Sequence, residues 1–512
     1  MRTKYSMINM IFGVGGHVLN MVLAFVSRMI FIRYLDAAYL GVSGLFSDIL
    51  GMLNLAELGI GSAMIFSMYK PAALDDREQL GKLMNLYKLM YRLVAAFVLA
   101  AGLCLLPFLN VLIKGDPGIE HLRLIYLMYL GNSVSSYLLS YKNSILQAYQ
   151  KAYVRTVVEQ IAHAVQIVLQ VVVLIVTQNF LLYLLLQILT QISINLVVSR
   201  RVDKEFPYLK DEKRLPSKEE RSGIMKNILA LSMHRLGSAV VNSTDNLLMS
   251  AFVGLTSVGI YSNYKLVIKS IGDLLNKVYT AFTGSIGNLG ATQDPAYIYR
   301  IYKQLDFFLF LLFGYFSAGM VVLFNPFIKL MFGEEYLFSQ AVVIIVVVQF
   351  YITGMRQINL QFREAMGLFW YDRYKPVAES IINLVVSILL VQRYGVAGVF
   401  LGTIVSTMTT CFWVEPYILM KYGLKEQWQE KLRDYFIEYG RRALTVVGGS
   451  IVGLCFTGGM RDSFLWFILK GILFTVEYAA LIFLTYGRSE EFKALLEHGK
   501  NFLKQRLDRK KT

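Results

Sequence analysis

The sequence predicts an all-α protein that crosses a membrane many times. Three observations point to this fold class: 56% of the 512 residues are hydrophobic, long apolar runs recur along most of the chain, and short polar segments separate them. Each run approaches the ~20 residues that a helix needs to cross a bilayer, and each is too long for a strand of a membrane barrel. Because lipid offers no partner to backbone groups, membrane-spanning helices are the architecture that remains.

We count about fourteen spans in the chain. The connections between them alternate between charged and nearly uncharged, as expected when successive loops lie on opposite sides of a membrane. The predicted spans are residues 8–32, 40–68, 86–113, 122–148, 154–177, 180–198, 228–252, 258–289, 305–324, 338–360, 376–391, 396–420, 443–456 and 464–485.

The basic residues fall mainly in alternate connections. The chain has 51 lysines and arginines and a formal net charge of +16, and most of these residues share a side with the N-terminus. Cytoplasmic loops of membrane proteins carry such an excess. We therefore expect both termini to be cytoplasmic. We also interpret the basic charge as a sign of topology, and we expect no nucleic-acid partner.

The chain repeats itself with a shift near 218 residues. Four features recur in the same order at about this spacing. They are a turn that ends in glycine (Gly41 and Gly259), a proline (Pro107 and Pro326), a second glycine (Gly115 and Gly333) and a glutamate (Glu159 and Glu379). Such a parallel repeat predicts two six-helix lobes followed by two further helices. The predicted domains are an N-terminal lobe (1–199), a cytoplasmic linker (200–222), a C-terminal lobe (223–422), a cytoplasmic amphipathic segment (423–442), two C-terminal spans (443–486) and a basic cytoplasmic tail (487–512).

Several spans carry polar side chains that a lipid-facing helix would not keep. Ionisable groups at membrane depth usually face a bundle interior or a wet cavity, and a spacing of four residues keeps side chains on one helical face. Cations outnumber acids in the central spans, so we predict a cationic cavity between the lobes for an anionic substrate. The residues predicted to line it are Arg28, Arg235, Asn242, Asn246, Lys265, Lys269 and Arg356.

The acidic residues in these spans allow two interpretations. Glu57, Asp245 and Asp273 are candidates for coupling transport to H⁺ or Na⁺. Alternatively, the charges pair with one another as contacts between helices, for example Asp273 with Lys269.

No motif for enzyme chemistry stands out in the sequence. The three cysteines lie in apolar runs without metal-ligand spacing, and no phosphate-binding loop or catalytic-triad pattern is present. The outer connections are short, unlike the large external loops of membrane-embedded glycan polymerases and ligases. We therefore expect a transporter and not an enzyme, with no cofactor other than a coupling ion.

Three segments carry a family resemblance. Residues 57–63 read ELGIGSA, residues 241–246 read VNSTDN, and residues 362–369 read FREAMGLF. These segments resemble the polysaccharide transporter branch of the multidrug/oligosaccharidyl-lipid/polysaccharide (MOP) exporter superfamily. The resemblance extends from about residue 7 to residue 422, and the last two spans fit the fourteen-span form of that branch.

The resemblance implies both an architecture and a function. The architecture is two six-helix lobes arranged in a V around a cationic cavity. The function is flipping of undecaprenyl-diphosphate-linked oligosaccharides across the bacterial cytoplasmic membrane by alternating access, for capsule, exopolysaccharide or O-antigen synthesis. Glycosyltransferases and a glycan polymerase are the implied partners. A lipid II flippase and a cation-coupled multidrug exporter are the alternatives within the superfamily.

Overall fold

The computed structural model describes residues 22–57, 60–113, 118–149, 151, 153–210, 212, 214–280, 294–366, 368, 371–372, 374–461 and 463–497, though not every side chain within them. Every regular element in these ranges is a helix, with no strand among them, so the predicted all-helical architecture is confirmed for this part of the chain. Contacts divide the chain into two compact units, Met1–Gly259 and Ile260–Thr512. The predicted domain boundaries stay a prediction.

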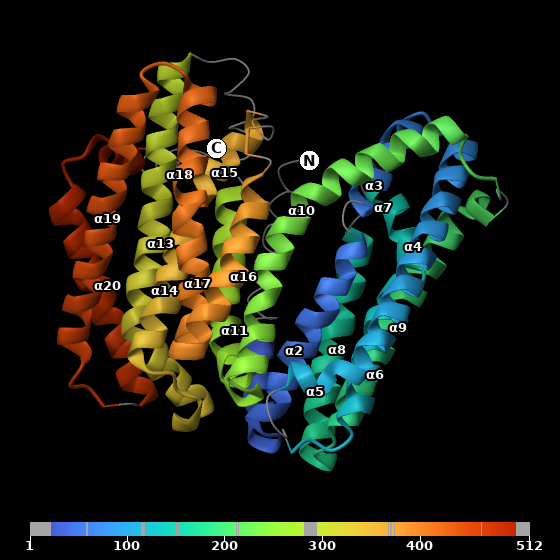
Figure 1. The fold of residues 1–512 in the computed structure, drawn as a ribbon, viewed down its shortest axis with the longest axis horizontal. Helices are drawn as coiled ribbons and strands as arrows, with labels where there is room; N and C mark the ends of the chain where they lie inside the picture. The colour runs from blue at the N-terminus through green and yellow to red at the C-terminus, as the bar shows by residue number, and fades with distance from the viewer. Residues whose placement is uncertain are drawn as a thin grey trace, which may run out of the picture. The chain divides into compact units, whose positions relative to one another are not determined.

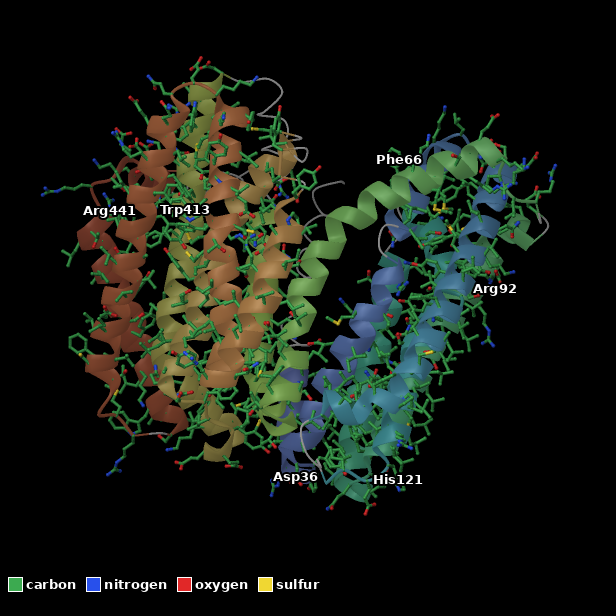
Figure 2. The ribbon with its side chains drawn as sticks, in the orientation of Figure 1. Asp36, Phe66, Arg92, His121, Trp413 and Arg441 are labelled. Carbon is green, nitrogen blue, oxygen red and sulfur yellow. The ribbon has the colours of Figure 1, made fainter. Side chains whose placement is uncertain are left out.

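The first unit contains a bundle of long apolar helices. Its main members are α4 (Arg77–Leu105), α6 (Leu122–Tyr137), α8 (Tyr153–Thr177) and α9 (Phe180–Glu205), and Figure 1 shows them running side by side. Shorter helices α2 (Ala37–Leu53), α3 (Ile60–Ala73), α5 (Leu109–Leu112) and α7 (Asn143–Ala148) pack among them, and α10 (Lys218–Phe252) packs against α2 and α3. Asp36 and His121 lie at one end of this unit and Phe66 at the other (Figure 2), as the predicted alternation of loops requires.

Polar caps fix the starts of these helices. The Asp76 side chain accepts from the Gln79 amide at the start of α4, and the Asn179 side chain accepts from two amides at the start of α9. Ser217 and Glu220 form a reciprocal capping box at the start of α10. Such side chains replace the partners that the first amides of a helix lack.

Three predicted spans of the first unit are interrupted, and in one of them, residues 86–113, a 3-10 turn at Leu106–Phe108 separates α4 from α5. The predicted span 40–68 is divided into α2, a 3-10 turn at Asn54–Glu57 and α3, and the predicted span 122–148 is divided into α6, a turn and α7. The break after α6 places Leu139 at φ 65°, a conformation that non-glycine residues seldom adopt. Polar groups satisfy the released backbone there, because the Asn195 amide donates to the Ser135 carbonyl at 2.9 Å.

The second unit is built around α13 (Pro295–Phe332). This helix packs against α14 (Gln340–Met355), α19 (Trp428–Thr457) and α20 (Phe464–Tyr486) (Figure 1). The remaining helices are α11 (Leu255–Thr280), α15 (Gln357–Ala365), α16 (Lys375–Tyr394), α17 (Val396–Thr409) and α18 (Cys411–Ile418), followed by a π-helical turn at Leu419–Leu424. The predicted amphipathic segment and the thirteenth span form one continuous helix, α19.

Eight helices of the described chain are long and apolar enough to cross a membrane. The chain is therefore a multi-pass membrane protein, and the count of fourteen spans stays a prediction. Residues 1–21 lie outside the described chain, the interrupted helices α2 and α6 are short, and α10 and α11 carry the polar groups noted in the sequence.

Candidate functional site

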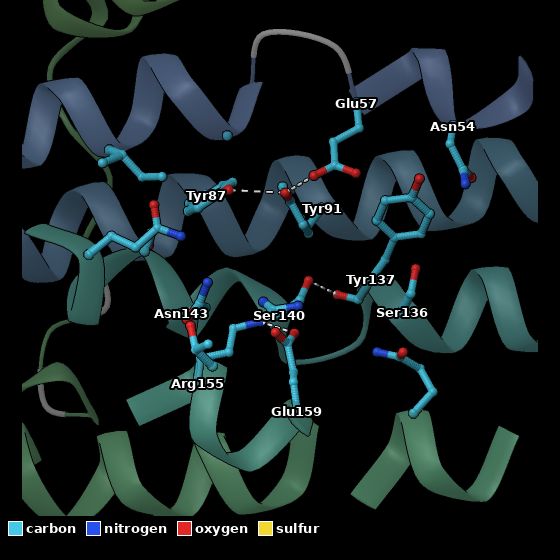
Figure 3. Close-up of a pocket in the computed structure, with 16 residues that line it drawn as sticks. Asn54, Glu57, Tyr87, Tyr91, Ser136, Tyr137, Ser140, Asn143, Arg155 and Glu159 are labelled. Atoms are coloured by element: carbon cyan, nitrogen blue, oxygen red, sulfur yellow. Dashed lines mark hydrogen bonds and ion pairs between the residues drawn. The ribbon is translucent and has the colours of Figure 1, made fainter. Parts of the chain in front are cut away.

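The first unit encloses a polar cavity of about 720 Å³. Figure 3 shows the cavity bordered by side chains from several helices. Hydroxyl, amide and charged groups dominate its lining, which consists of Asn54, Glu57, Gly61, Ile65, Tyr87, Tyr91, Ser136, Tyr137, Ser140, Asn143, Ser144, Gln147, Arg155, Thr156, Glu159 and Gln191. A polar cavity inside a bundle of membrane-length helices is typical of a transport pathway.

Two of the helix interruptions create this cavity. Asn54 and Glu57 come from the break between α2 and α3, Ser136 and Tyr137 end α6, and Ser140 lies in the 3-10 turn that follows α6. Because irregular backbone at membrane depth is tolerated where it lines a cavity, discontinuous helices are a usual way to build transport sites.

Glu57 is the centre of a hydrogen-bond chain on one wall. The Tyr91 hydroxyl donates to the Glu57 carboxylate, and the Tyr87 hydroxyl donates to Tyr91 at 3.0 Å (Figure 3). The Tyr137 hydroxyl also bonds to Glu57. The rings of Tyr87 and Tyr91 pack edge to face with centroids 4.5 Å apart. Phenols from α4 and α6 thus hold the Glu57 carboxylate at the cavity wall.

The opposite wall carries an ion pair. Arg155 and Glu159, one turn apart at the start of α8, form a salt bridge and neutralise each other (Figure 3). Glu57 adds one formal negative charge when ionised. The described lining therefore contains no cation without an acidic partner.

Comparisons with known proteins identify the fold of the chain. No protein-family model and no curated protein matches the chain. Among solved structures, the lipid II flippase MurJ in an inward closed conformation matches at a TM-score of 0.63 and 14% identity, covering 93% of this chain and 99% of MurJ. A multidrug resistance MATE family transporter in an inward-facing conformation matches at 0.61 and 16%, covering 80% of this chain and 96% of its own. A MOP superfamily transporter from Pyrococcus furiosus matches at 0.52 and 15%, covering 80% and 94%. The chain has the fold of MOP superfamily transporters.

Within this MOP fold, the sequence-predicted residues of the first unit have different surroundings. Arg28 lies on the helix at residues 22–34, near the phenols of Tyr129 and Tyr183. Asn246 is buried, and its amide donates to the Asp48 carboxylate at 2.7 Å. Asp245 is also buried. The side chains of Arg235 and Asn242 lie outside the described part of the chain.

Lys265, Lys269 and Asp273 lie on α11 in the second unit. Lys269 pairs with Asp273 at 2.8 Å, and their side chains are 68% and 42% exposed. Lys269 and Asp273 therefore form the internal ion pair that the sequence offered as an alternative. The Lys269 ammonium is nevertheless exposed. Lys265 is partly exposed one turn earlier. A shared cleft for these cations and those of the first unit stays a prediction.

Arg356 lies in a buried ionic network of the second unit. Its guanidinium donates to both oxygens of Glu415 at 3.0 and 2.7 Å, and it lies 3.5 Å from Glu379. Lys375 bonds to the same Glu415 at 2.5 Å, and Lys375 also pairs with Asp372. Arg356 is thus neutralised within its own unit, and its role as a substrate ligand stays a prediction.

Sequence reasoning identified Glu57 but missed most of its neighbours. Tyr91, Tyr137 and Asn143 were not singled out, because tyrosines and amides are common at the boundaries of membrane helices. The run of polar residues from Asn132 to Ser144 inside an apolar span was a usable signal. The described residues contain no cluster of three or more His, Cys, Asp or Glu that could hold a metal ion.

Proposed function

We propose that the chain is a flippase for undecaprenyl-diphosphate-linked oligosaccharide repeat units. It moves them across the bacterial cytoplasmic membrane for synthesis of a surface polysaccharide. The observation that carries the proposal is the polar cavity of the first unit, which a protein of purely structural role has no reason to keep within membrane-length helices. The substrate class comes from the three sequence segments that resemble the polysaccharide transporter branch.

Charge supports an anionic, sugar-bearing substrate over a cationic drug. Lys265 and Lys269 are partly or largely exposed cations on α11, and in this proposal they bind the diphosphate through charge-assisted hydrogen bonds. The cavity of the first unit supplies amides and hydroxyls suited to sugars. A site for a hydrophobic drug requires a more apolar lining than this cavity has.

Alternating access moves the substrate in this proposal, and Glu57 is the proposed coupling group. Its carboxylate lies at the wall of the polar cavity and accepts hydrogen bonds from phenol hydroxyls. Binding or release of H⁺ or Na⁺ therefore rearranges the hydrogen bonds between the Asn54–Glu57 turn, α4 and α6. Lipid-linked glycan, membrane lipids, the glycan polymerase and glycosyltransferases are the proposed partners.

Complementation tests this function. The gene is expressed in strains that lack a resident oligosaccharide flippase, in a strain depleted of MurJ, and in a strain deleted for drug exporters. Recovery of surface glycan with no gain in drug resistance is the expected result. Rescue of the MurJ-depleted strain alone assigns lipid II as the substrate. Increased drug resistance without glycan recovery overturns the proposal in favour of a drug exporter.

A further inference from the structure

We propose that the cavity of the first unit binds the sugar part of the lipid-linked substrate and excludes its diphosphate. This inference rests on the proposed function. It assigns the sugar and the diphosphate of the substrate to two different binding sites. The neutral glycan head occupies the cavity beside Glu57, and the diphosphate is bound by cations elsewhere in the chain.

The charge of the cavity excludes a diphosphate. Such a group carries more than one negative charge and needs cationic donors once it leaves water. Arg155 is the one lysine or arginine among the described lining residues, and Glu159 already neutralises it. Glu57 adds a further negative charge, so an anionic group in this cavity meets net repulsion.

The hydrogen-bonding groups of the cavity fit a polyol. Each sugar hydroxyl both donates and accepts, so its best partners are groups that do the same. Four carboxamides, Asn54, Asn143, Gln147 and Gln191, line the space together with hydroxyls. The Asn143 side chain is buried, and its amide oxygen has no hydrogen-bond partner in the described part of the chain. A buried acceptor without a donor is costly, and a ligand hydroxyl can supply that donor once the side chain adjusts.

The second unit shows that the fold does not require such a cavity. The shift of 218 that relates the two halves places Leu138, where α6 ends, on Arg356, where α14 ends. In the second unit the interruption is occupied by an ionic cluster, in which the Arg356 and Lys375 side chains both bond to Glu415. The first unit keeps an open polar space at the equivalent position, and we attribute the difference to a ligand that only the first unit binds.

The predicted topology places the cavity toward the cytoplasm. Arg155 and Glu159 stand at the start of α8, which follows a predicted cytoplasmic connection, and Asn143 and Gln147 belong to the short helix before it. A glycan assembled on the cytoplasmic side therefore meets this cavity before it crosses the membrane.

Matched soluble substrates test the inference. Farnesyl diphosphate and farnesyl diphosphate linked to glucose, galactose or N-acetylglucosamine share a tail and a diphosphate but differ in the sugar, and the diphosphate without a sugar is the more negatively charged. Binding of each to the purified full-length chain is measured by calorimetry. We expect at least one sugar-bearing probe to bind about tenfold more tightly than farnesyl diphosphate, which corresponds to one or two net hydrogen bonds.

Two variants locate the sugar. Asn143→Ala and Gln191→Ala are each expected to reduce that tenfold preference to about threefold or less without changing the affinity for farnesyl diphosphate. Gln187→Ala is the matched control, since Gln187 is one turn earlier on α9 and does not line the cavity. The thermal unfolding midpoint of each variant is recorded to show that the chain stays folded.

Each outcome decides between the two proposals. Equal affinity for all four probes overturns the sugar subsite while leaving the flippase function, which is judged separately by recovery of surface glycan. A sugar preference that survives both substitutions, or a loss of affinity for farnesyl diphosphate in both variants, also overturns the subsite. Failure of the wild-type chain to bind any probe, together with failure to restore surface glycan, overturns the proposed function itself.

Discussion

Gly41 and Gly259 make reciprocal backbone contacts. A Cβ added at Gly41 would lie 2.0 Å from the Leu255 carbonyl oxygen, and a Cβ added at Gly259 would lie 2.0 Å from the Ala37 carbonyl oxygen. Residues 37 and 41 are separated from 255 and 259 by the same 218 positions that the sequence repeat predicts. Each of these glycines therefore provides the space for a close backbone approach from the other segment.

This contact predicts that Gly41→Ala is strongly destabilising. A separation of 2.0 Å from a backbone oxygen cannot be relieved by a side-chain rotation, so the helices must separate, and we expect a loss of at least about 2–3 kcal/mol in the free energy of unfolding. Thermal unfolding in detergent measures the effect. Gly51→Ala is the control in the same helix, because nothing lies within 4 Å of its added Cβ, and it is expected to leave stability unchanged or raise it slightly. Equal stability of the two variants would disprove the close approach.

The hydrogen bond from Tyr91 to Glu57 predicts that substitutions along this chain of hydroxyls slow glycan export to different degrees. Tyr91→Phe removes a hydrogen bond from the Glu57 carboxylate, whereas Tyr87→Phe leaves that bond in place. We expect Tyr91→Phe to slow glycan export several-fold, Tyr87→Phe to have a smaller effect, and Glu57→Gln to remove the response of export to an imposed pH gradient. Export is measured in inverted vesicles at several imposed gradients. A wild-type response in Glu57→Gln would exclude coupling through this residue.

The Arg356–Glu415 pair predicts a structural phenotype. Glu415 is 1% exposed, so Arg356→Ala leaves a buried carboxylate with Lys375 as its main remaining cation. Breaking a buried pair costs about 3–5 kcal/mol, and we expect the protein level in membranes and the unfolding temperature both to fall. Arg356→Lys keeps a charge but loses the two-point contact, and it should be intermediate. If Arg356→Ala instead kept normal stability and lost export, the predicted role as a substrate ligand would be the better account.

The sequence was sufficient for the helices but not for their interruptions. Apolar runs and caps such as Ser217 with Glu220 are local signals, so the all-helical fold followed from them. The polar run from Asn132 to Ser144 marks the region of the break, but the position of the break at Leu139 depends on a contact that is not local, the hydrogen bond that the Asn195 amide donates to the Ser135 carbonyl. Glu57 stood out as a charge in an apolar run. Its partner Tyr91 did not, since the contact joins residues 34 positions apart.

The start of α10 predicts a response to acid. The Ser217 amide donates to Glu220 at 2.9 Å, and this backbone hydrogen bond is the main cause that lowers the pKa of the Glu220 carboxyl below its ordinary value. The Gln79 amide of α4 donates to the same carboxylate at 2.8 Å. Because the folded pKa is depressed, this stabilisation is present above the ordinary pKa of a glutamate carboxyl and is lost as pH falls through the lower, folded pKa.

Hydrogen exchange at the Ser217 amide measures this response. We expect its protection, corrected for intrinsic exchange, to fall as pH is lowered through the depressed folded pKa of Glu220. Glu220→Gln keeps an acceptor that does not titrate, so it should make the protection independent of pH in this range. Glu219→Gln is the control one position earlier. A protection that falls equally in the Glu220→Gln variant would assign the acid response to another group.

Substitution of Lys269 distinguishes a role in substrate binding from a role in protein stability. Its pair with Asp273 is exposed and one turn long, and such pairs contribute only about 0.3–0.5 kcal/mol. Lys269→Ala should therefore keep the protein level and the unfolding temperature of the wild type. If the ammonium binds the substrate diphosphate, the same variant should abolish surface glycan, because no neutral side chain replaces a charge-assisted hydrogen bond.

Three further variants at this pair complete the test. Lys269→Arg keeps the charge and should retain more export than Lys269→Ala, whereas Lys269→Gln should behave like the alanine variant. Asp273→Asn releases the ammonium from its partner without removing it, so export should persist. Surface glycan is measured by immunoblot at matched protein levels. Full export by Lys269→Gln would contradict a diphosphate role for this residue, and loss of export in Asp273→Asn would show that the pair itself, and not the free cation, is what transport requires.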